Sequence, residues 1–250
     1  MDCKILGNGG AFDKLSTAYL IESKILVDCG QTVISSMIGD KLYSPELDMI
    51  EHLFITHIHS DHINGLESLL YNRFIKRNFE YDNNFTIYGT REVLEYYKSI
   101  AFSKDSFNNG EYYQPFKFVE LPLNGGSSIL IEDLNIYVNF VKAKHMNNSL
   151  ECLTYIFGDI KSYAIKKIII TGDIDQPSEL ITSNMIDKNT LIFYDMGWTG
   201  LPNVERYYKF HPTEEEIYNI FGKNDNIIGI HTSADLQYYE KAQINKIYKV

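Results

Sequence analysis

Runs of apolar residues divide the chain into many short strands and a few helices. The stretches STAYLIES and KILVDCG meet at Glu22-Ser23-Lys24, which predicts a β-hairpin. β-Branched and aromatic residues, which are typical of strands, dominate further stretches: HLFIT, FTIYG, ILIEDLNIYVNFVKAK, TYIFGD, KKIIITGD, TLIFYDMG and NIIGIH. Strands therefore make up most of the predicted regular structure.

Three segments fit helices. SPELDMIEH has Ser44 as its N-cap, Pro45 at the first helical position and acidic residues in the opening turn. Residues 66–79 and 91–101 also have a helical pattern. Many strands separated by a few helices predict a layered α/β protein. No repeat, low-complexity segment or Pro/Ser-rich linker marks a boundary, so residues 1–250 are interpreted as one domain.

The composition is that of an ordinary globular protein, with 44% hydrophobic and 22% charged residues. The start MDCKILGNGG lacks the regions of a secretory signal, and no long apolar run occurs, so a cytoplasmic, non-membrane location is expected. The three cysteines, Cys3, Cys29 and Cys152, have no CxxC spacing and are expected to pack in the core. The formal net charge of −10 disfavours a long nucleic acid as partner.

Histidines and aspartates recur where apolar strands end. These residues are His57, His59, Asp61 and His62 after HLFIT, then His145, Asp173 and His231 after three later strands. If the strands lie in neighbouring sheets, the seven side chains meet at one rim. A single histidine after a strand is usually not a ligand, but HxHxDH is a specific pattern for metal binding. His52 lies before the strand end and is expected to take no part.

The spacing within THIHSDH predicts two metal positions. Residues two apart on extended chain point the same way, so His57 and His59 can bind one ion. Asp61 and His62, where the chain turns into a helix, face a second ion. Five imidazoles and two carboxylates suit two divalent ions, with zinc expected and manganese as the alternative.

As a set, these motifs resemble the metallo-β-lactamase fold superfamily. The resemblance extends from GNGGAF and Asp28 in ILVDCG, through HIHSDH, to His145, Thr171-Gly172-Asp173 and His231. It implies an αββα sandwich with one ion held by His57, His59 and His145, the other by Asp61, His62 and His231, and Asp173 bridging both. Because the superfamily includes lactonases, thioesterases, β-lactamases, redox enzymes and phosphodiesterases, the fold alone does not identify the reaction.

The final third of the chain resembles the RNase Z branch of this superfamily. His211-Pro-Thr in FHPTEEE and the later His231-Thr-Ser are similar to two elements of that branch. There, the earlier histidine protonates the leaving oxygen of a phosphodiester, and Glu214 and Glu215 are expected to orient the His211 imidazole and raise its pKa. The alternative is that His211 only precedes a helix that begins near Pro212. A general acid favours phosphodiesters over lactones and thioesters.

The tRNA endonucleases of that branch carry a long Gly- and Lys-rich arm between the third ligand motif and the bridging aspartate. Residues 146–172 here have room only for two strands and a turn. The chain therefore resembles the compact cyclic nucleotide phosphodiesterases of the anti-Pycsar type, which are often phage-encoded. This resemblance implies a homodimer that hydrolyses 3′,5′-cyclic mononucleotides to nucleoside monophosphates, with a possible role in counter-defence.

Asp61 is then expected to orient the attacking water or take its proton, and His211 to protonate the departing ribose oxygen. Aromatic residues in the segment 101–118 either cover the site, in the same chain or a dimer partner, or pack in the core, and Trp198 is a second candidate for base stacking. Three alternatives stay open: an RNase Z-like tRNA 3′-end endonuclease, a lactonase or thioesterase of this fold, and a metal-free interaction module. The last is disfavoured because no expected ligand is missing.

Overall fold

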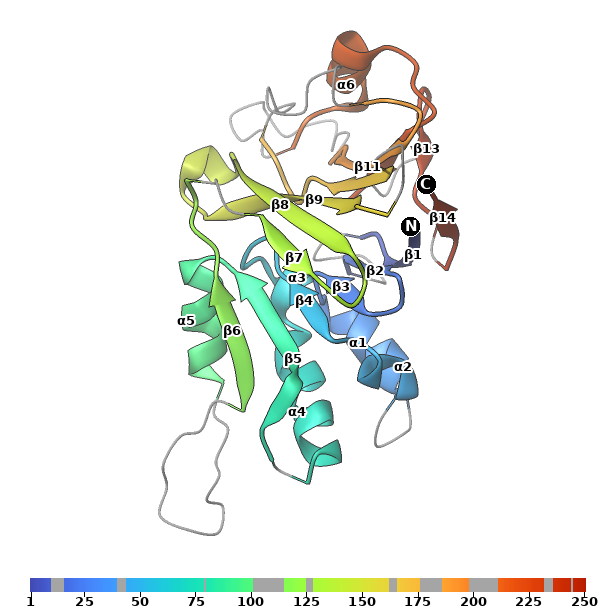
Figure 1. The fold of residues 1–250 in the computed structure, drawn as a ribbon. Coiled ribbons are helices and arrows are strands. Elements are labelled where there is room, and N and C mark those ends of the chain that lie inside the picture. The colour runs from blue at the N-terminus through green and yellow to red at the C-terminus, as the bar shows by residue number, and fades with distance from the viewer. Residues whose placement is uncertain are drawn as a thin grey trace.

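Two sheets facing each other, with helices on both outer faces, make up the fold (Figure 1). The computed structural model describes residues 1–9, 16–39, 44–78, 80–100, 115–124, 128–161, 166–175, 186–197, 211–231, 236–243 and 245–250. Each sheet has seven strands. The αββα arrangement implied by the sequence is confirmed.

The first sheet has the strand order β14-β1-β2-β3-β4-β5-β6. Its strands are β1 (Asp2–Gly7), β2 (Ala18–Ile21), β3 (Ile25–Val27), β4 (His52–Phe54), β5 (Asp82–Gly89), β6 (Phe116–Glu120) and β14 (Ile247–Lys249). The predicted hairpin is present, because β2 pairs antiparallel with β3 around a turn in which Glu22 and Ser23 have positive φ. β3 is parallel to β4, so both strands finish at the same end of the sheet, and the segments that follow them leave from there.

The second sheet has the order β13-β12-β11-β10-β9-β8-β7. Its strands are β7 (Ile129–Ile131), β8 (Ile136–Ala143), β9 (Cys152–Asp159), β10 (Lys166–Ile170), β11 (Thr190–Asp195), β12 (Ile227–Ile230) and β13 (Glu240–Lys241). The run ILIEDLNIYVNFVKAK is two antiparallel strands rather than one, because the chain reverses at a turn that ends at Asn135, with φ of 54°. Neighbouring strands from β10 to β13 are parallel, so β10 and β12 finish at the same end of the sheet.

The helices flank the sheets. They are α1 (Gln31–Ile38), α2 (Pro45–Asp48), α3 (Ser60–Ile63), α4 (Leu66–Lys76), α5 (Arg91–Ser99) and α6 (Glu214–Phe221), with a 3₁₀ turn η1 (Met146–Asn148). Ser44 is the N-cap of α2, as predicted, but this helix has only four residues. A capping box between Thr213 and Glu216 begins α6, and Gly222, with φ of 62°, ends it. No described helix is long and apolar enough to cross a membrane.

Apolar side chains form three layers of core. One cluster lies between the sheets, one between the first sheet and α1 to α5, and one between the second sheet and α6. Phe54 of β4 stacks on Tyr88 at 4.3 Å between ring centroids and meets Phe157 of the second sheet edge-on at 5.5 Å. The three cysteines are free and buried in these layers, as predicted.

The segment after β4 is fixed to the second sheet by hydrogen bonds. Tyr155 of β9 donates its hydroxyl to the carbonyl of Ile55 at 2.7 Å, and the Leu153 N–H donates to the carbonyl of Thr56 at 3.0 Å. The segment THIHSDH, which follows β4 of the first sheet, is thus held by both sheets.

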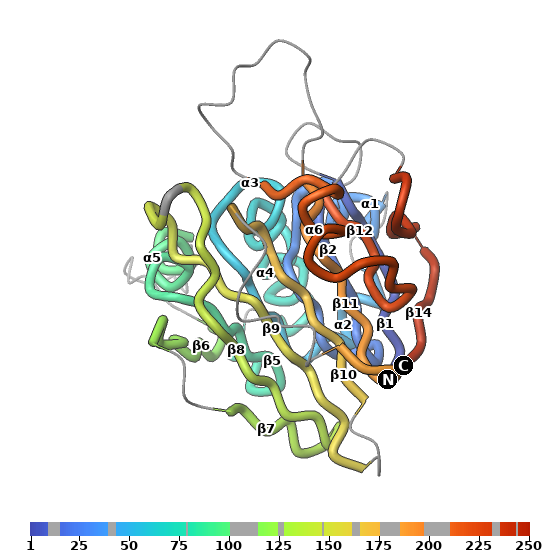
Figure 2. The backbone as a smooth tube through the Cα atoms, turned by 90° about the horizontal axis from the view of Figure 1, so that it is seen from above, coloured from blue at the N-terminus to red at the C-terminus, as the bar shows by residue number. Residues whose placement is uncertain are grey.

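At the far side of the first sheet, β1 pairs with β14, so the two termini lie side by side (Figure 2).

A buried arginine fastens α4 to the first sheet. Arg73 contacts Asp82 at 2.7 Å, donates to the carbonyls of Leu47 and Ile50, and lies 4.3 Å above the ring of Phe85. Replacement of Arg73 by Met leaves the Asp82 carboxylate buried without its main partner. We expect a loss of about 3 kcal/mol in the free energy of unfolding, measured by urea denaturation.

The matched control for this prediction is Arg77→Ala. Arg77 lies 3.6 Å from the same carboxylate but is 42% exposed, so its loss is expected to cost less than about 1 kcal/mol. Equal, small effects of the two substitutions would contradict the assigned role of Arg73.

Candidate metal centre

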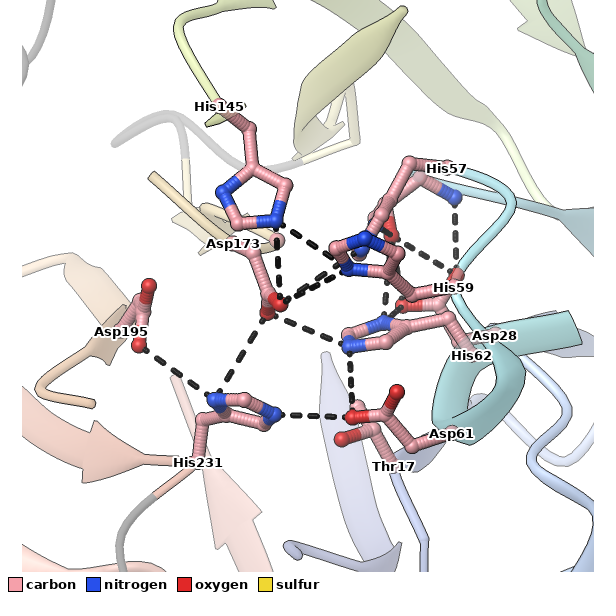
Figure 3. Close-up of polar contacts among 12 residues, drawn as sticks. Thr17, Asp28, His57, His59, Asp61, His62, His145, Asp173, Asp195 and His231 are labelled. Carbon is pink, nitrogen blue, oxygen red and sulfur yellow. Dashed lines mark hydrogen bonds and ion pairs between the residues drawn. The ribbon is translucent and has the colours of Figure 1, made fainter. Parts of the chain in front are cut away.

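The seven side chains predicted as ligands meet at one rim of the sandwich (Figure 3). His57, His59, Asp61 and His62 follow β4, His145 follows β8, Asp173 follows β10 and His231 follows β12. The first sheet therefore supplies four of these residues and the second sheet three. Polar residues at strand ends converge because the chain leaves both sheets toward the same space.

The candidate ligand atoms form two groups that share Asp173. The first group comprises His57, His59, His145 and Asp173, and the second comprises Asp61, His62, Asp173 and His231. Within each group the atoms lie within 4.8 Å of one another. This is the division that the sequence predicts, while metal binding by each residue stays a prediction.

Asp173 faces both groups with different oxygens. Its Oδ2 lies 3.5 Å from His57 Nε2 and 3.7 Å from His145 Nε2, both in the first group. Its Oδ1 lies 3.2 Å from His62 Nε2 in the second. A carboxylate placed in this way can bind one ion through each oxygen.

His62 is turned toward the second group by a buried carboxylate. Asp28, which follows β3 and has φ of 58°, lies 2.8 Å from His62 Nδ1. The same carboxylate accepts hydrogen bonds from the backbone N–H and the hydroxyl of Thr56. These contacts fix the ring, so that Nε2 points into the site and acts as the candidate donor atom.

The donor set fits divalent metal. The buried Nε2 atoms of His57 and His62 have no hydrogen-bond partner among the residues that the structure describes, although both face Asp173. A buried polar atom without a partner is costly, and a cation between the imidazoles and carboxylates would satisfy it. Imidazole nitrogen with carboxylate oxygen is a donor set that zinc and manganese both accept.

The electrostatics of the site favour bound cations. Burial opposes ionisation of Asp61 and Asp173, but the surrounding imidazoles outweigh it and lower the pKa of both carboxyls. Burial lowers the pKa of His57, and it lowers that of His145 to about 3. At His62 and His231 the carboxylates outweigh burial and raise the pKa, so a cation that binds there displaces protons, because metal ligands are ionised carboxylates and neutral imidazoles.

His211 lies beside both groups. Its ring centroid is 5.5 Å from that of His145 and 4.8 Å from that of His231. Its Nδ1 is 2.8 Å from Oδ2 of Asp195, a fully buried residue at the end of β11. Burial opposes protonation, but Asp195 outweighs it and raises the pKa of His211 to about 9. Gly197 permits this approach, because a Cβ there would lie 1.8 Å from His211 Cβ.

The expectation that Glu214 and Glu215 orient His211 is wrong. The Glu214 carboxylate instead accepts hydrogen bonds from the backbone N–H groups of Gln237, Tyr238 and Tyr239, and Glu215 is exposed. Asp195 takes the orienting role, and it is held in turn by backbone N–H groups at 2.9 Å. The signal was available in the sequence, because Asp195 ends the apolar stretch TLIFYD as the other site residues end theirs.

His52 lies outside the two groups, as expected from the sequence. It begins β4, and its Nδ1 lies 3.3 Å from the hydroxyl of Tyr88, at the opposite end of the strand from His57. Residues 101–114 of the aromatic segment and Trp198 lie outside the described residues. Their contact with a base therefore stays a prediction.

The fold and the paired His/Asp groups define a protein of the metallo-β-lactamase fold. The solved metallo-β-lactamase fold protein YhfI from Bacillus subtilis is similar, with a TM-score of 0.71 over 99% of this chain and 98% of that one. Its sequence identity is 15%, so this likeness concerns the fold alone.

The chain belongs to the anti-Pycsar protein Apyc1 family, whose model matches residues 1–217. An anti-Pycsar protein Apyc1 of Bacillus phage 010DV004 is 38% identical over 82 residues, covering 30% of this chain and 31% of that protein. A ribonuclease Z of Borrelia duttonii (strain Ly) is 28% identical over 159 residues, covering 61% of this chain. The match spans 46% of that ribonuclease Z, less than half of its length.

Proposed function

We propose that the protein is a metal-dependent phosphodiesterase that hydrolyses 3′,5′-cyclic mononucleotides to nucleoside monophosphates. The observation that carries this proposal is the Asp195–His211 pair, 2.8 Å apart, beside two candidate metal groups that share Asp173. Hydrolysis of lactones and thioesters does not generally need a separate general acid. An alkoxide leaving group from ribose does, because it is a strong base.

Two divalent ions, when bound, would stabilise charge on the phosphoryl oxygens and increase the acidity of water. The Asp61 carboxylate, at the edge of the second group, is placed to orient the attacking water or take its proton. Asp195 accepts from Nδ1 of His211, which leaves the Nε2 proton of the imidazolium for transfer. That proton passes to the departing ribose oxygen as its bond to phosphorus breaks.

Three observations support a small substrate. The family model that matches the chain is that of the anti-Pycsar protein Apyc1, and the sequence resembles cyclic nucleotide phosphodiesterases of that type. The chain carries a formal net charge of −10, which disfavours a polyanion. The interval between His145 and Asp173 contains η1, β9 and β10, and 162–165 lie outside the described residues. A long arm that grips tRNA has no room there.

A second candidate is a tRNA 3′-end endonuclease, favoured by the similarity to ribonuclease Z of Borrelia duttonii. The two candidates are separated by incubating metal-loaded protein with 3′,5′-cyclic mononucleotides, a precursor tRNA, a lactone and a thioester. We expect rapid turnover of a cyclic mononucleotide and little or none of the others. Cleavage of precursor tRNA without turnover of any cyclic mononucleotide would reverse the assignment, and turnover of only the lactone or thioester would reject phosphodiester chemistry.

A further inference from the structure

The backbone around His231 is held by a side chain from the opposite sheet. Asn8 follows β1 and is 6% exposed. Its Oδ1 accepts a hydrogen bond from the His231 N–H at 2.9 Å, and its Nδ2 donates to the carbonyl of Ala242 at 3.1 Å. His231 has φ of 59°, a conformation that is unfavourable for a residue with a Cβ. The buried amide therefore supports a backbone geometry that His231 does not adopt readily by itself.

This geometry aims the imidazole of His231. With its backbone held, His231 places Nε2 2.9 Å from Oδ2 of Asp61, inside the second group. A change of backbone conformation at this residue would swing the ring away from the group. Among the described residues, Asn8 has no hydrogen bond to another candidate ligand, so its influence is directed at the second group.

Asp175 holds His145 in a comparable way. Its backbone N–H donates to the carbonyl of Lys144 at 2.7 Å, and its Oδ1 accepts from the Met146 N–H at 2.8 Å. The residues on both sides of His145 are thus tied to Asp175. The same Oδ1 lies 3.5 Å from His145 Nδ1, while His145 Nε2 faces His59 and Asp173. Because His145 Nδ1 forms no hydrogen bond among the described residues, Asp175 positions His145 through the backbone on both sides of it.

We infer that Asn8 and Asp175 are positioning residues, Asn8 for the ion of the second group through His231 and Asp175 for the ion of the first group through His145. This inference rests on the proposed two-ion centre. It adds that the affinities of the two ions are set separately, by contacts outside the ligand set. Loss of an outer contact of this kind typically weakens metal binding by about 10- to 100-fold.

The test is a calorimetric titration of Zn²⁺ into metal-free protein, with a competing chelator to resolve two binding steps. Asn8→Ala is expected to weaken one step by about 10- to 100-fold and leave the other unchanged. Asp175→Ala, which removes the acceptor for the Met146 N–H, is expected to weaken the other step. The double variant should weaken both steps.

Two further variants separate positioning from stability. Asn8→Asp keeps an oxygen acceptor for the His231 N–H, so it should bind Zn²⁺ more like wild type than Asn8→Ala. Tyr239→Phe removes a buried hydroxyl that donates to the Gly222 carbonyl at 2.7 Å in the same region, and it should leave both steps intact. If Asn8→Ala does not fold, Asp175→Ala still tests the inference at the first group, with Asp175→Asn as its control, because asparagine keeps an oxygen for the Met146 N–H.

The outcomes are distinct. Fewer than one ion bound by wild type would reject the proposed centre itself. If wild type binds two ions, three results would overturn the positioning roles of Asn8 and Asp175. The variants at these two positions could weaken the same step, weaken both steps equally, or weaken neither step. Weakening by Asn8→Asp as large as by Asn8→Ala would likewise reject the role of the His231 contact.

Discussion

The variant His211→Ala is expected to lose about two to four orders of magnitude in kcat on a 3′,5′-cyclic mononucleotide while keeping its metal. His211 is not a member of either group formed by the seven predicted ligands, although with Asp195 it forms a further cluster around Asp173 and His231. Its removal takes away the proton for the ribose oxygen and leaves the seven candidate ligands in place. Initial rates and metal content, measured on the same preparation, check this expectation.

The loss should depend on the leaving group. A nitrophenolate departs without protonation, so the His211→Ala variant should recover much of its activity on a nitrophenyl phosphodiester. Asp195→Asn should resemble His211→Ala, because it removes the charge that keeps His211 protonated. Glu214→Gln is the matched control. It should keep the wild-type ratio of activities on the two substrates, since Glu214 binds the backbone at residues 237–239. Small, equal effects of His211→Ala on both substrates would remove the general acid from the mechanism.

Replacing His62 by alanine is expected to remove bound metal and reduce activity to the background rate. Wild-type protein should bind two divalent ions per chain, measured by elemental analysis. His62 lies in the second group, and its Nε2 is 3.2 Å from Asp173, which both groups share. Its loss should therefore weaken metal binding by the second group and by the shared Asp173. His59→Ala should have a similar effect through the first group. Circular dichroism should show that most of the fold is retained.

His52→Ala is the control for this experiment. His52 belongs to the same segment but contacts Tyr88, away from both groups, so its variant should keep metal and activity. Active wild-type protein with less than half an ion per chain would contradict the metal centre. Full metal content in His62→Ala would remove His62 from the ligand set.

The sequence predicts the site better than it predicts the helices. Ligands at strand ends can be recognised because an apolar run followed by His or Asp is a local pattern, and the seven candidates indeed meet. Helix α1 (QTVISSMI) was not predicted, since its β-branched residues favour strands, and burial of Val33 and Ile34 outweighs that preference. Helix α2 is shorter than predicted, because the chain enters β4 at His52.

The partner of His211 shows where sequence reasoning ends. Glu214 and Glu215 are close in sequence, and a helical first turn makes them natural candidates. Asp195 is 16 positions away and ends β11, whereas His211 lies just before α6. Such a contact depends on how α6 is placed against the second sheet, which periodicity does not reveal. Asn8 and His231, 223 positions apart, illustrate the same point.

The origin of the ligands in two different sheets has a thermodynamic consequence. Each group draws side chains from the segment after β4 and from ends of the second sheet, so an ion bound there joins the two halves of the sandwich. Such binding requires the folded chain, which makes conformational stability a function of the free metal concentration. Above saturation, every tenfold increase in free ion adds about 1.4 kcal/mol per site to the stability. A chelator would therefore act as a mild denaturant of this protein, and the melting temperature would report metal affinity.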